Sequence, residues 1–104
     1  MFMRSENLLL RPIWPEDRGR VRALRVPRDH PVRAGDLFAS FLVTHPSSGL
    51  GAPVGLAGWD RNLSRKWWLD DGLDADAEID AALAEMIVAA DGRAPAGHLH
   101  PEFA

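Results

Sequence analysis

Three side chains near the end of the chain belong to the types that bind metal ions. His98, His100 and Glu102 alternate in the sequence, so on a β-strand all three would lie on one face. Two imidazoles and a carboxylate can hold a divalent metal. Histidines on a terminal strand without any ligand are nevertheless far commoner than such sites. We therefore predict no metal site.

A second chemical feature is a group of six acidic residues between Asp70 and Asp80. A calcium-binding loop needs a fixed ligand spacing, a central glycine and a terminal glutamate, and this segment has none of them. Carboxylates at the start of a helix are instead stabilised by the helix dipole. We interpret the acids as residues that cap and solvate a helix, with Asp74 or Asp76 as the cap.

Residue types alone do not identify a catalytic group. The chain has no cysteine and no tyrosine, which removes thiolate nucleophiles, disulfides and zinc–sulfur sites. Glu16, His45 and Asp60 could act as bases, but the sequence does not distinguish them from ordinary surface residues. The catalytic residues therefore stay unassigned.

Size and composition suit one soluble domain over residues 1–104. Hydrophobic residues make up 46% of the chain and charged residues 26%, and the formal net charge is −3. Six arginines lie between Arg18 and Arg33, but few aromatic residues interleave with them and the whole chain is acidic, which argues against nucleic acid. No apolar segment is long enough to cross a bilayer. We expect a cytoplasmic protein with neither nucleic acid nor membrane as partner.

The first elements that must position these groups follow from the apolar pattern and the turn residues. A helix should begin at Pro15, because its fixed φ and missing N–H suit the first helical position. Short apolar and β-branched segments bounded by turn residues predict strands. Four such strands are expected, over 8–13, 37–44, 54–59 and 65–69.

The clearest element is a second helix after the acidic group. Its apolar stripe recurs at helical spacing over Ile79, Ala82, Leu83, Met86, Ile87 and Ala90. Gly92 supplies a left-handed exit from this helix. A further strand within 93–103 would then lie parallel to the strand at 65–69, in a right-handed strand–helix–strand unit.

Three sequence segments resemble the GNAT acetyltransferase superfamily, in particular its branch that acetylates protein N-terminal amines, including those of ribosomal proteins, and small-molecule amines. LLLRPIWPED (8–17) resembles the opening strand and helix start of that family, LVTHPSSGLGAPVGLAGW (42–59) its central hairpin, and WWL (67–69) its fourth strand. The resemblance implies a mixed α/β fold of order strand–helix–strand–strand–strand–helix–strand. The sheet would be mostly antiparallel, with a parallel unit between the fourth and fifth strands. The domain would be shorter at its C-terminus than the family's usual fold.

The resemblance also implies acetyl-CoA as cofactor and an amine-bearing small molecule or a protein N-terminus as acceptor. The pantetheine arm would pair with the backbone of Trp68 and Leu69, and the pyrophosphate would lie at the loop around Gly72. This loop departs from the family's glycine-rich signature, because it reads DDGLDADAEID (70–80). Each carboxylate would repel a nearby phosphate by about 1 kcal/mol even in water. The resemblance therefore predicts an N-acetyltransferase domain that is weakly active or inactive.

A hypothesis from a different class uses the same scaffold without catalysis. If the last strands of the family fold are absent, a sheet edge and apolar surface stay uncovered, and a second copy could cover them. The chain would then be an association module that forms a homodimer.

Overall fold

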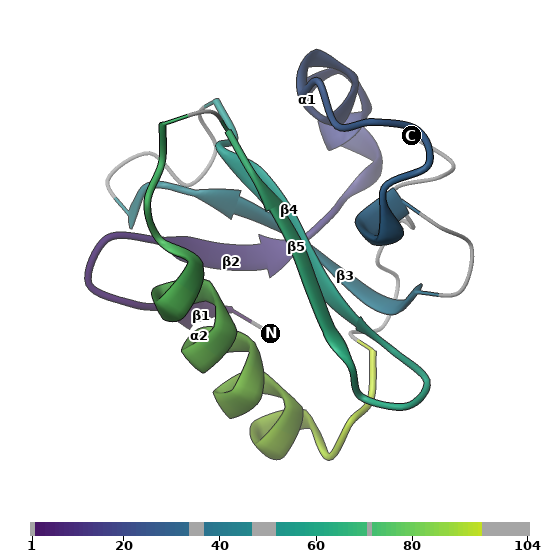
Figure 1. Cartoon of the computed structure of the whole chain (residues 1–104), viewed down its shortest axis with the longest axis vertical. Helices are drawn as coiled ribbons and strands as arrows, with labels where there is room; N and C mark the ends of the chain where they lie inside the picture. The colour runs from purple at the N-terminus through teal and green to yellow at the C-terminus, as the bar shows by residue number, and fades with distance from the viewer. Residues whose placement is uncertain (1, 34–36, 47–51, 71, 95–104) are drawn as a thin grey trace.

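The computed structural model describes residues 2–33, 37–46, 52–70 and 72–94. Within them the fold is mixed α/β: a five-stranded antiparallel sheet and two α-helices (Figure 1). The strands are β1 Met3–Arg4, β2 Leu9–Pro12, β3 Leu37–Thr44, β4 Gly55–Asp60 and β5 Arg65–Leu69. The helices are α1 Arg18–Ala23 and α2 Asp76–Ala90, with 3-10 turns η1 at Pro15–Asp17 and η2 at Pro31–Arg33.

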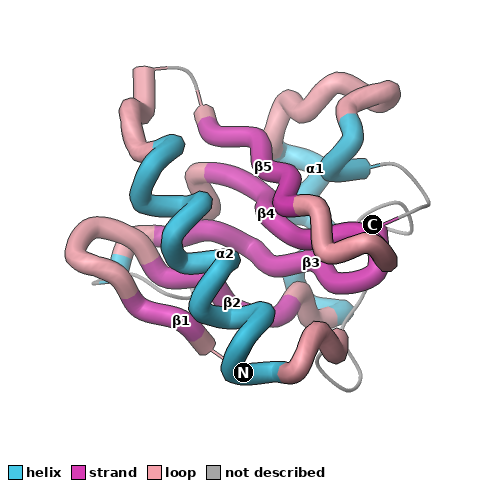
Figure 2. Tube along the Cα trace, turned by 60° about the horizontal axis from the view of Figure 1, so that its bottom comes forward, coloured by secondary structure: helices cyan, strands magenta, loops and turns pink. Residues whose placement is uncertain are grey.

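The sheet follows the chain, because its strand order is β1-β2-β3-β4-β5 and each strand pairs antiparallel with the next. The register places Leu42 of β3 between Arg11 of β2 and Leu56 of β4. Trp68 of β5 continues this row beside Leu56. The two α-helices lie on opposite faces of the sheet, with α2 crossing one face and α1 behind the other (Figure 2).

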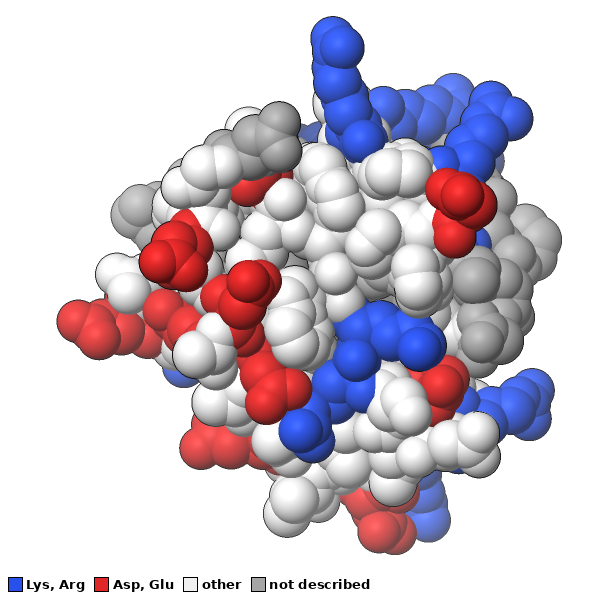
Figure 3. All heavy atoms as spheres, viewed as in Figure 1, with Lys and Arg blue, Asp and Glu red and all other residues white. Residues whose placement is uncertain are grey.

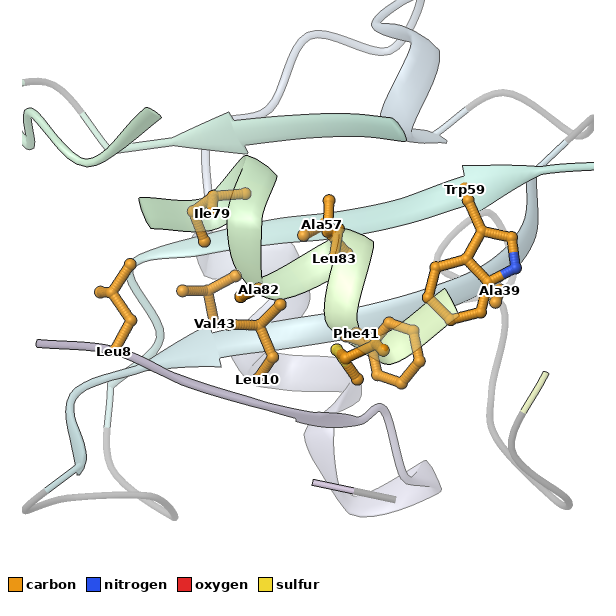
Figure 4. Close-up of a cluster of buried hydrophobic side chains, with 11 residues drawn as sticks. Leu8, Leu10, Ala39, Phe41, Val43, Ala57, Trp59, Ile79, Ala82 and Leu83 are labelled. Atoms are coloured by element: carbon orange, nitrogen blue, oxygen red, sulfur yellow. The ribbon is translucent and has the colours of Figure 1, made fainter. Parts of the chain in front are cut away.

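The larger core lies between α2 and the sheet (Figure 4). Alternate residues of the strands face this helix, and its apolar stripe faces them, as the two periodicities require. Each large apolar side chain buried here contributes on the order of 1.5–3 kcal/mol. The buried members are Leu8, Leu10, Ala39, Phe41, Val43, Ala57, Trp59, Ile79, Ala82, Leu83 and Met86.

A second core lies on the other face, under α1 and η2. It is built from the residues of β3 and β4 that point away from α2, together with the apolar side of α1 and the segment that follows it. Trp68 packs against its rim. The buried members are Ile13, Val21, Leu24, Val26, Val32, Leu37, Leu42 and Leu56.

The structure confirms the predicted strands at 37–44 and 65–69 and the helix that carries the apolar stripe. The prediction that Asp74 or Asp76 caps this helix is wrong. Its N-cap is Ala75, without a side-chain cap, because the carboxylate of Asp76 accepts a hydrogen bond from the Trp67 indole instead. The left-handed exit is shared between Asp91 and Gly92, with φ of 54° and 73°.

The mixed α/β class is confirmed, whereas all strand pairs among the described residues are antiparallel. The strand expected within 93–103, and with it the parallel unit, lies almost wholly outside the described residues, as do His98, His100 and Glu102. The described chain adds elements that were not predicted, namely the two-residue strand β1 and the 3-10 turn η2. None of the described helices has the length and the apolar run needed to cross a membrane.

Candidate functional site

The backbone at the outer edge of β5 is the first feature that could bind a ligand. Along a strand of an antiparallel pair, two kinds of residue alternate. The backbone groups of one kind bond to the partner strand, and those of the other kind point away from it. The N–H of Asp60 donates to the carbonyl of Ser64 at 3.1 Å, so by alternation the Gly58–Lys66 and Leu56–Trp68 pairs exchange bonds. The backbone groups of Arg65, Trp67 and Leu69 then point away from β4.

This alternation decides which of the backbone groups expected to bind a ligand are accessible at the outer edge. The carbonyl of Trp68 faces β4 and lies so close to Gly55 that a side chain there would collide with it. Trp68 therefore offers its backbone to the sheet rather than to a ligand. The backbone groups of Leu69 and Trp67 point toward the outer edge instead. Among the described residues no strand pairs with this outer edge.

The acidic side chains of α2 bind the helix to the sheet. Asp80 pairs with Arg65, with 2.7 Å between Oδ1 and Nε. Asp76 Oδ1 accepts a hydrogen bond from Trp67 Nε1 at 2.8 Å. Both contacts join the first turns of α2 to the last strand. Asp76 and Asp80 therefore contact β5 while they stay accessible to solvent, and the interpretation of the acids as capping and solvating groups did not include these contacts.

Glu78 makes the corresponding contact at the opposite edge of the sheet. Its carboxylate accepts hydrogen bonds from the Ser5 hydroxyl and, at 3.0 Å, from the backbone N–H of Asn7. The Asn7 side chain donates a further bond at 3.1 Å. The Ser5 hydrogen bond, assisted by those from Asn7, lowers the pKa of Glu78. Acids of α2 thus reach both the β1–β2 turn and β5.

Gly72 lies in the loop between β5 and α2. Its φ of 84° is left-handed, and the space around its Cα is open. The adjacent turn is closed by the N–H of Leu73, which donates to the carbonyl of Asp70 at 3.1 Å. Asp70 and Asp74 are both exposed beside it. The backbone of Gly72 is therefore accessible, but the charge around it disfavours phosphate.

Two hollows lie near β5, one lined by three of its residues and the other by Asp70, which follows it. The first, here called the His30 hollow, has a volume of about 240 Å³ and is lined by His30, Pro31, Arg65, Lys66 and Trp67. His30 Nδ1 accepts a hydrogen bond from the N–H of Val32 at 3.1 Å. Burial lowers the pKa of His30 despite the opposing charge of Asp29. In the neutral imidazole Nε2 then carries the proton and can donate it in a hydrogen bond.

The second hollow, here called the Arg25 hollow, lies at the end of β5 beside α1. Its volume is about 290 Å³, and its lining comprises Arg20, Ala23, Leu24, Arg25, Ala52, Pro53 and Asp70. Two arginines and one aspartate therefore line this hollow together with apolar residues. Figure 3 shows the wider charge pattern, with most acidic side chains on the side of α2 and basic ones both near α1 and across the middle of this face.

The three candidate bases do not come together. Glu16 is exposed in η1, and His45 is exposed after the end of β3. Asp60 lies at the opposite end of the β3–β4 pair, where its Oδ1 accepts hydrogen bonds from the N–H groups of Asn62 and Ser64, both at 2.9 Å. No group of three potential metal ligands occurs among the described residues.

A buried ion pair between β2 and η1 was not predicted. Arg11 and Asp17 are each 1% exposed and form a two-pronged contact, with N–O distances of 2.7 and 2.8 Å. The N–H of Trp14 donates to the same carboxylate at 2.8 Å. The guanidinium also lies over the Trp14 ring, 4.7 Å from its centroid. A signal did exist in the sequence, namely an arginine within an otherwise apolar strand.

The chain matches no protein-family model, no curated protein and no solved structure at a significant level, so the arguments for its function come from its own geometry.

Proposed function

We propose that the chain is a GNAT-like domain that takes acetyl-CoA along the outer edge of β5. The observation that carries the proposal is the pair of outward-facing backbone amides at Trp67 and Leu69, with the His30 hollow beside Trp67. The elements β2–α1–β3–β4–β5–α2 correspond to the first six in the order that the resemblance implies, whereas β1 has no counterpart in that order. A parallel fifth strand belongs to the same proposal.

The edge suits a ligand that is extended and carries amides. Trp67 and Leu69 are two residues apart, so their backbone groups repeat at about 6.6 Å. The pantetheine arm of coenzyme A has two amides that can pair with such groups, in the way a peptide adds to a sheet edge. The acyl group would then point to the His30 hollow, where His30 Nε2 can donate a hydrogen bond to its carbonyl oxygen.

The acceptor in this proposal is an amine-bearing small molecule or a protein N-terminus. Transfer requires a group that accepts the amine's proton. The side chains that line the His30 hollow offer donors, because His30 Nδ1 already accepts a bond from Val32 and the other polar residues are Arg65 and Lys66. We therefore expect binding with slow transfer and assign no catalytic residue.

Isothermal titration with acetyl-CoA tests this proposal. We expect saturable heat for the wild-type chain and an affinity about three- to tenfold lower for Leu69→Pro. Proline removes an N–H that points away from β4, so the ladder keeps its bonds. Leu69→Ala is the matched control, because it trims the same side chain and keeps the amide.

Two results would contradict the proposal. One is the lack of heat from wild-type protein at high micromolar acetyl-CoA. The other is an equal loss of affinity in Leu69→Pro and Leu69→Ala, which would assign the effect to the side chain. Circular dichroism of both variants shows whether they are folded and so keeps the comparison valid.

A second candidate function, homodimeric association, is favoured by the self-complementarity of the same edge. If two copies of β5 pair antiparallel about Trp67, then Arg65 lies opposite the second copy's Leu69, and Lys66 lies opposite its Trp68. No like charges meet, and Lys66 can contact an indole ring, which is a favourable pairing.

Sedimentation velocity over a range of concentrations tests this candidate. We expect a dimer that Lys66→Glu weakens by about fivefold, while Arg18→Glu, at an exposed arginine of α1, leaves it unchanged. Acetyl-CoA should also dissociate the dimer, since both need the same backbone groups. A monomer at every concentration would contradict the candidate.

A further inference from the structure

The charges of the Arg25 hollow differ from those of the loop at Gly72. Two arginines from α1 and the segment after it, Arg20 and Arg25, line the hollow with one carboxylate, Asp70. Arg20 also lies 3.4 Å from Asp17, but Arg11 already holds that carboxylate in a closer, two-pronged contact. The Arg20 side chain is 40% exposed. Its guanidinium can therefore bind a further anion.

The start of α2 is a poor alternative for the same anion. Its carboxylates are fixed in place by contacts with the sheet: Asp76 by Trp67, Glu78 by Ser5 and Asp80 by Arg65. They cannot turn away from a ligand without losing these bonds. An anionic group bound at the C-terminal end of β5 is therefore electrostatically favoured on the side of α1 and disfavoured on the side of α2.

We propose that the Arg25 hollow is an anion site that takes a phosphate or diphosphate group. Guanidinium groups bind phosphate oxygens through paired, charge-assisted hydrogen bonds. Ala23, Leu24 and Pro53 supply an apolar floor for the part of the ligand that carries the phosphate. That this ligand is the acyl carrier, bound across both ends of β5, rests on the proposed function, whereas the anion site does not.

Titration with inorganic pyrophosphate at low ionic strength, followed by ³¹P NMR or calorimetry, tests the site itself. We expect Arg25→Gln to weaken binding about five- to tenfold. Asp70→Asn should strengthen binding about two- to fivefold, because it removes the opposing charge. Arg18→Gln is the control, since Arg18 is exposed on the same helix but does not line the hollow.

Opposite effects of Arg25→Gln and Asp70→Asn, with Arg18→Gln unchanged, would support the site. No binding of pyrophosphate, or an equal loss in Arg18→Gln, would overturn it. Titrations with acetyl-CoA and with phosphate-free pantetheine distinguish a failure of this inference from a failure of the proposed function. If pyrophosphate binds but neither of these two does, the anion site stands and the acyl-carrier function fails.

Discussion

Replacing Asp17 by alanine is expected to lower the free energy of unfolding by about 3–5 kcal/mol. Asp17 and Arg11 are each 1% exposed, so the substitution leaves a buried guanidinium without its carboxylate. The Trp14 N–H loses its acceptor as well. Urea denaturation followed by tryptophan fluorescence measures the change. Arg11→Met combined with Asp17→Leu should cost less than Asp17→Ala alone, because no charge then stays buried.

The same pair predicts a dependence of stability on pH. Burial alone would raise the pKa of Asp17, but the hydrogen bonds from Arg11 and from the Trp14 N–H outweigh it, and the pKa is lowered. A lowered pKa stabilises the fold above the unfolded value of about 3.9. This contribution is lost as the pH falls below that value and through the folded pKa. Asp17→Asn should show a weaker loss over the same range.

Glu16→Ala is the matched control, because Glu16 is the exposed neighbour of Asp17 in the same turn. It should change the free energy of unfolding by no more than about 0.5 kcal/mol. If Asp17→Ala were equally mild, the ion pair would contribute little to the fold.

Gly58→Ala is expected to destabilise the chain by at least about 3 kcal/mol, which is the upper part of the range for overpacked sites. A Cβ at Gly58 would collide with the carbonyl oxygen of Ala39 and lie 3.1 Å from its carbonyl carbon. These are backbone atoms of the neighbouring strand β3, so no side-chain rotation can relieve the contact. Gly58 sits in the middle of the sheet, between Ser40 and Lys66. Thermal or urea unfolding measures the loss.

Gly19→Ala is expected to raise the free energy of unfolding, in contrast to Gly58→Ala. Gly19 lies in α1, and a Cβ there would meet no atom within 4 Å. Alanine is the better helix former, so this variant should gain about 0.5–1 kcal/mol. Equal and small effects of the two substitutions would contradict the close approach of β3 and β4.

Much of the fold could be predicted because it depends on local periodicity. The strand at Leu37–Thr44 is buried along almost its whole length, and a short apolar, β-branched segment signals that condition directly. The helix Asp76–Ala90 shows its buried face as a stripe at helical spacing. A strand or helix of this kind is specified by the residues within it.

What could not be predicted depends on partners far apart in the chain. The carboxylates at Asp76, Glu78 and Asp80 look like solvated groups in the sequence, because their partners on β5 and at the β1–β2 turn are not neighbours. The outward direction of the Trp67 and Leu69 backbone depends on which residue of β5 faces which residue of β4. Composition contains no such register information.

The motif that carries the family resemblance has a structural role in this chain. Its arginine and its aspartate, Arg11 and Asp17, bind one another, and its proline begins the turn that brings them together. These residues position β2 against η1 and α1. The motif therefore has a role in folding, and it gives no evidence for acetyl-CoA binding. Such evidence must come from the edge of β5.

The contacts of α2 with both edges of the sheet have a consequence for how the chain folds. The β3–β4 and β4–β5 pairs can form as hairpins, and β2 pairs with β3 across the intervening α1 and η2, but the Ser5–Glu78 bond joins residues 73 positions apart. Closing a loop of that length costs on the order of 4 kcal/mol of chain entropy. Contacts of high sequence separation slow folding. The rate-limiting event should therefore be the arrival of α2 on the paired strands, and substitutions at Glu78 should slow refolding more than they accelerate unfolding.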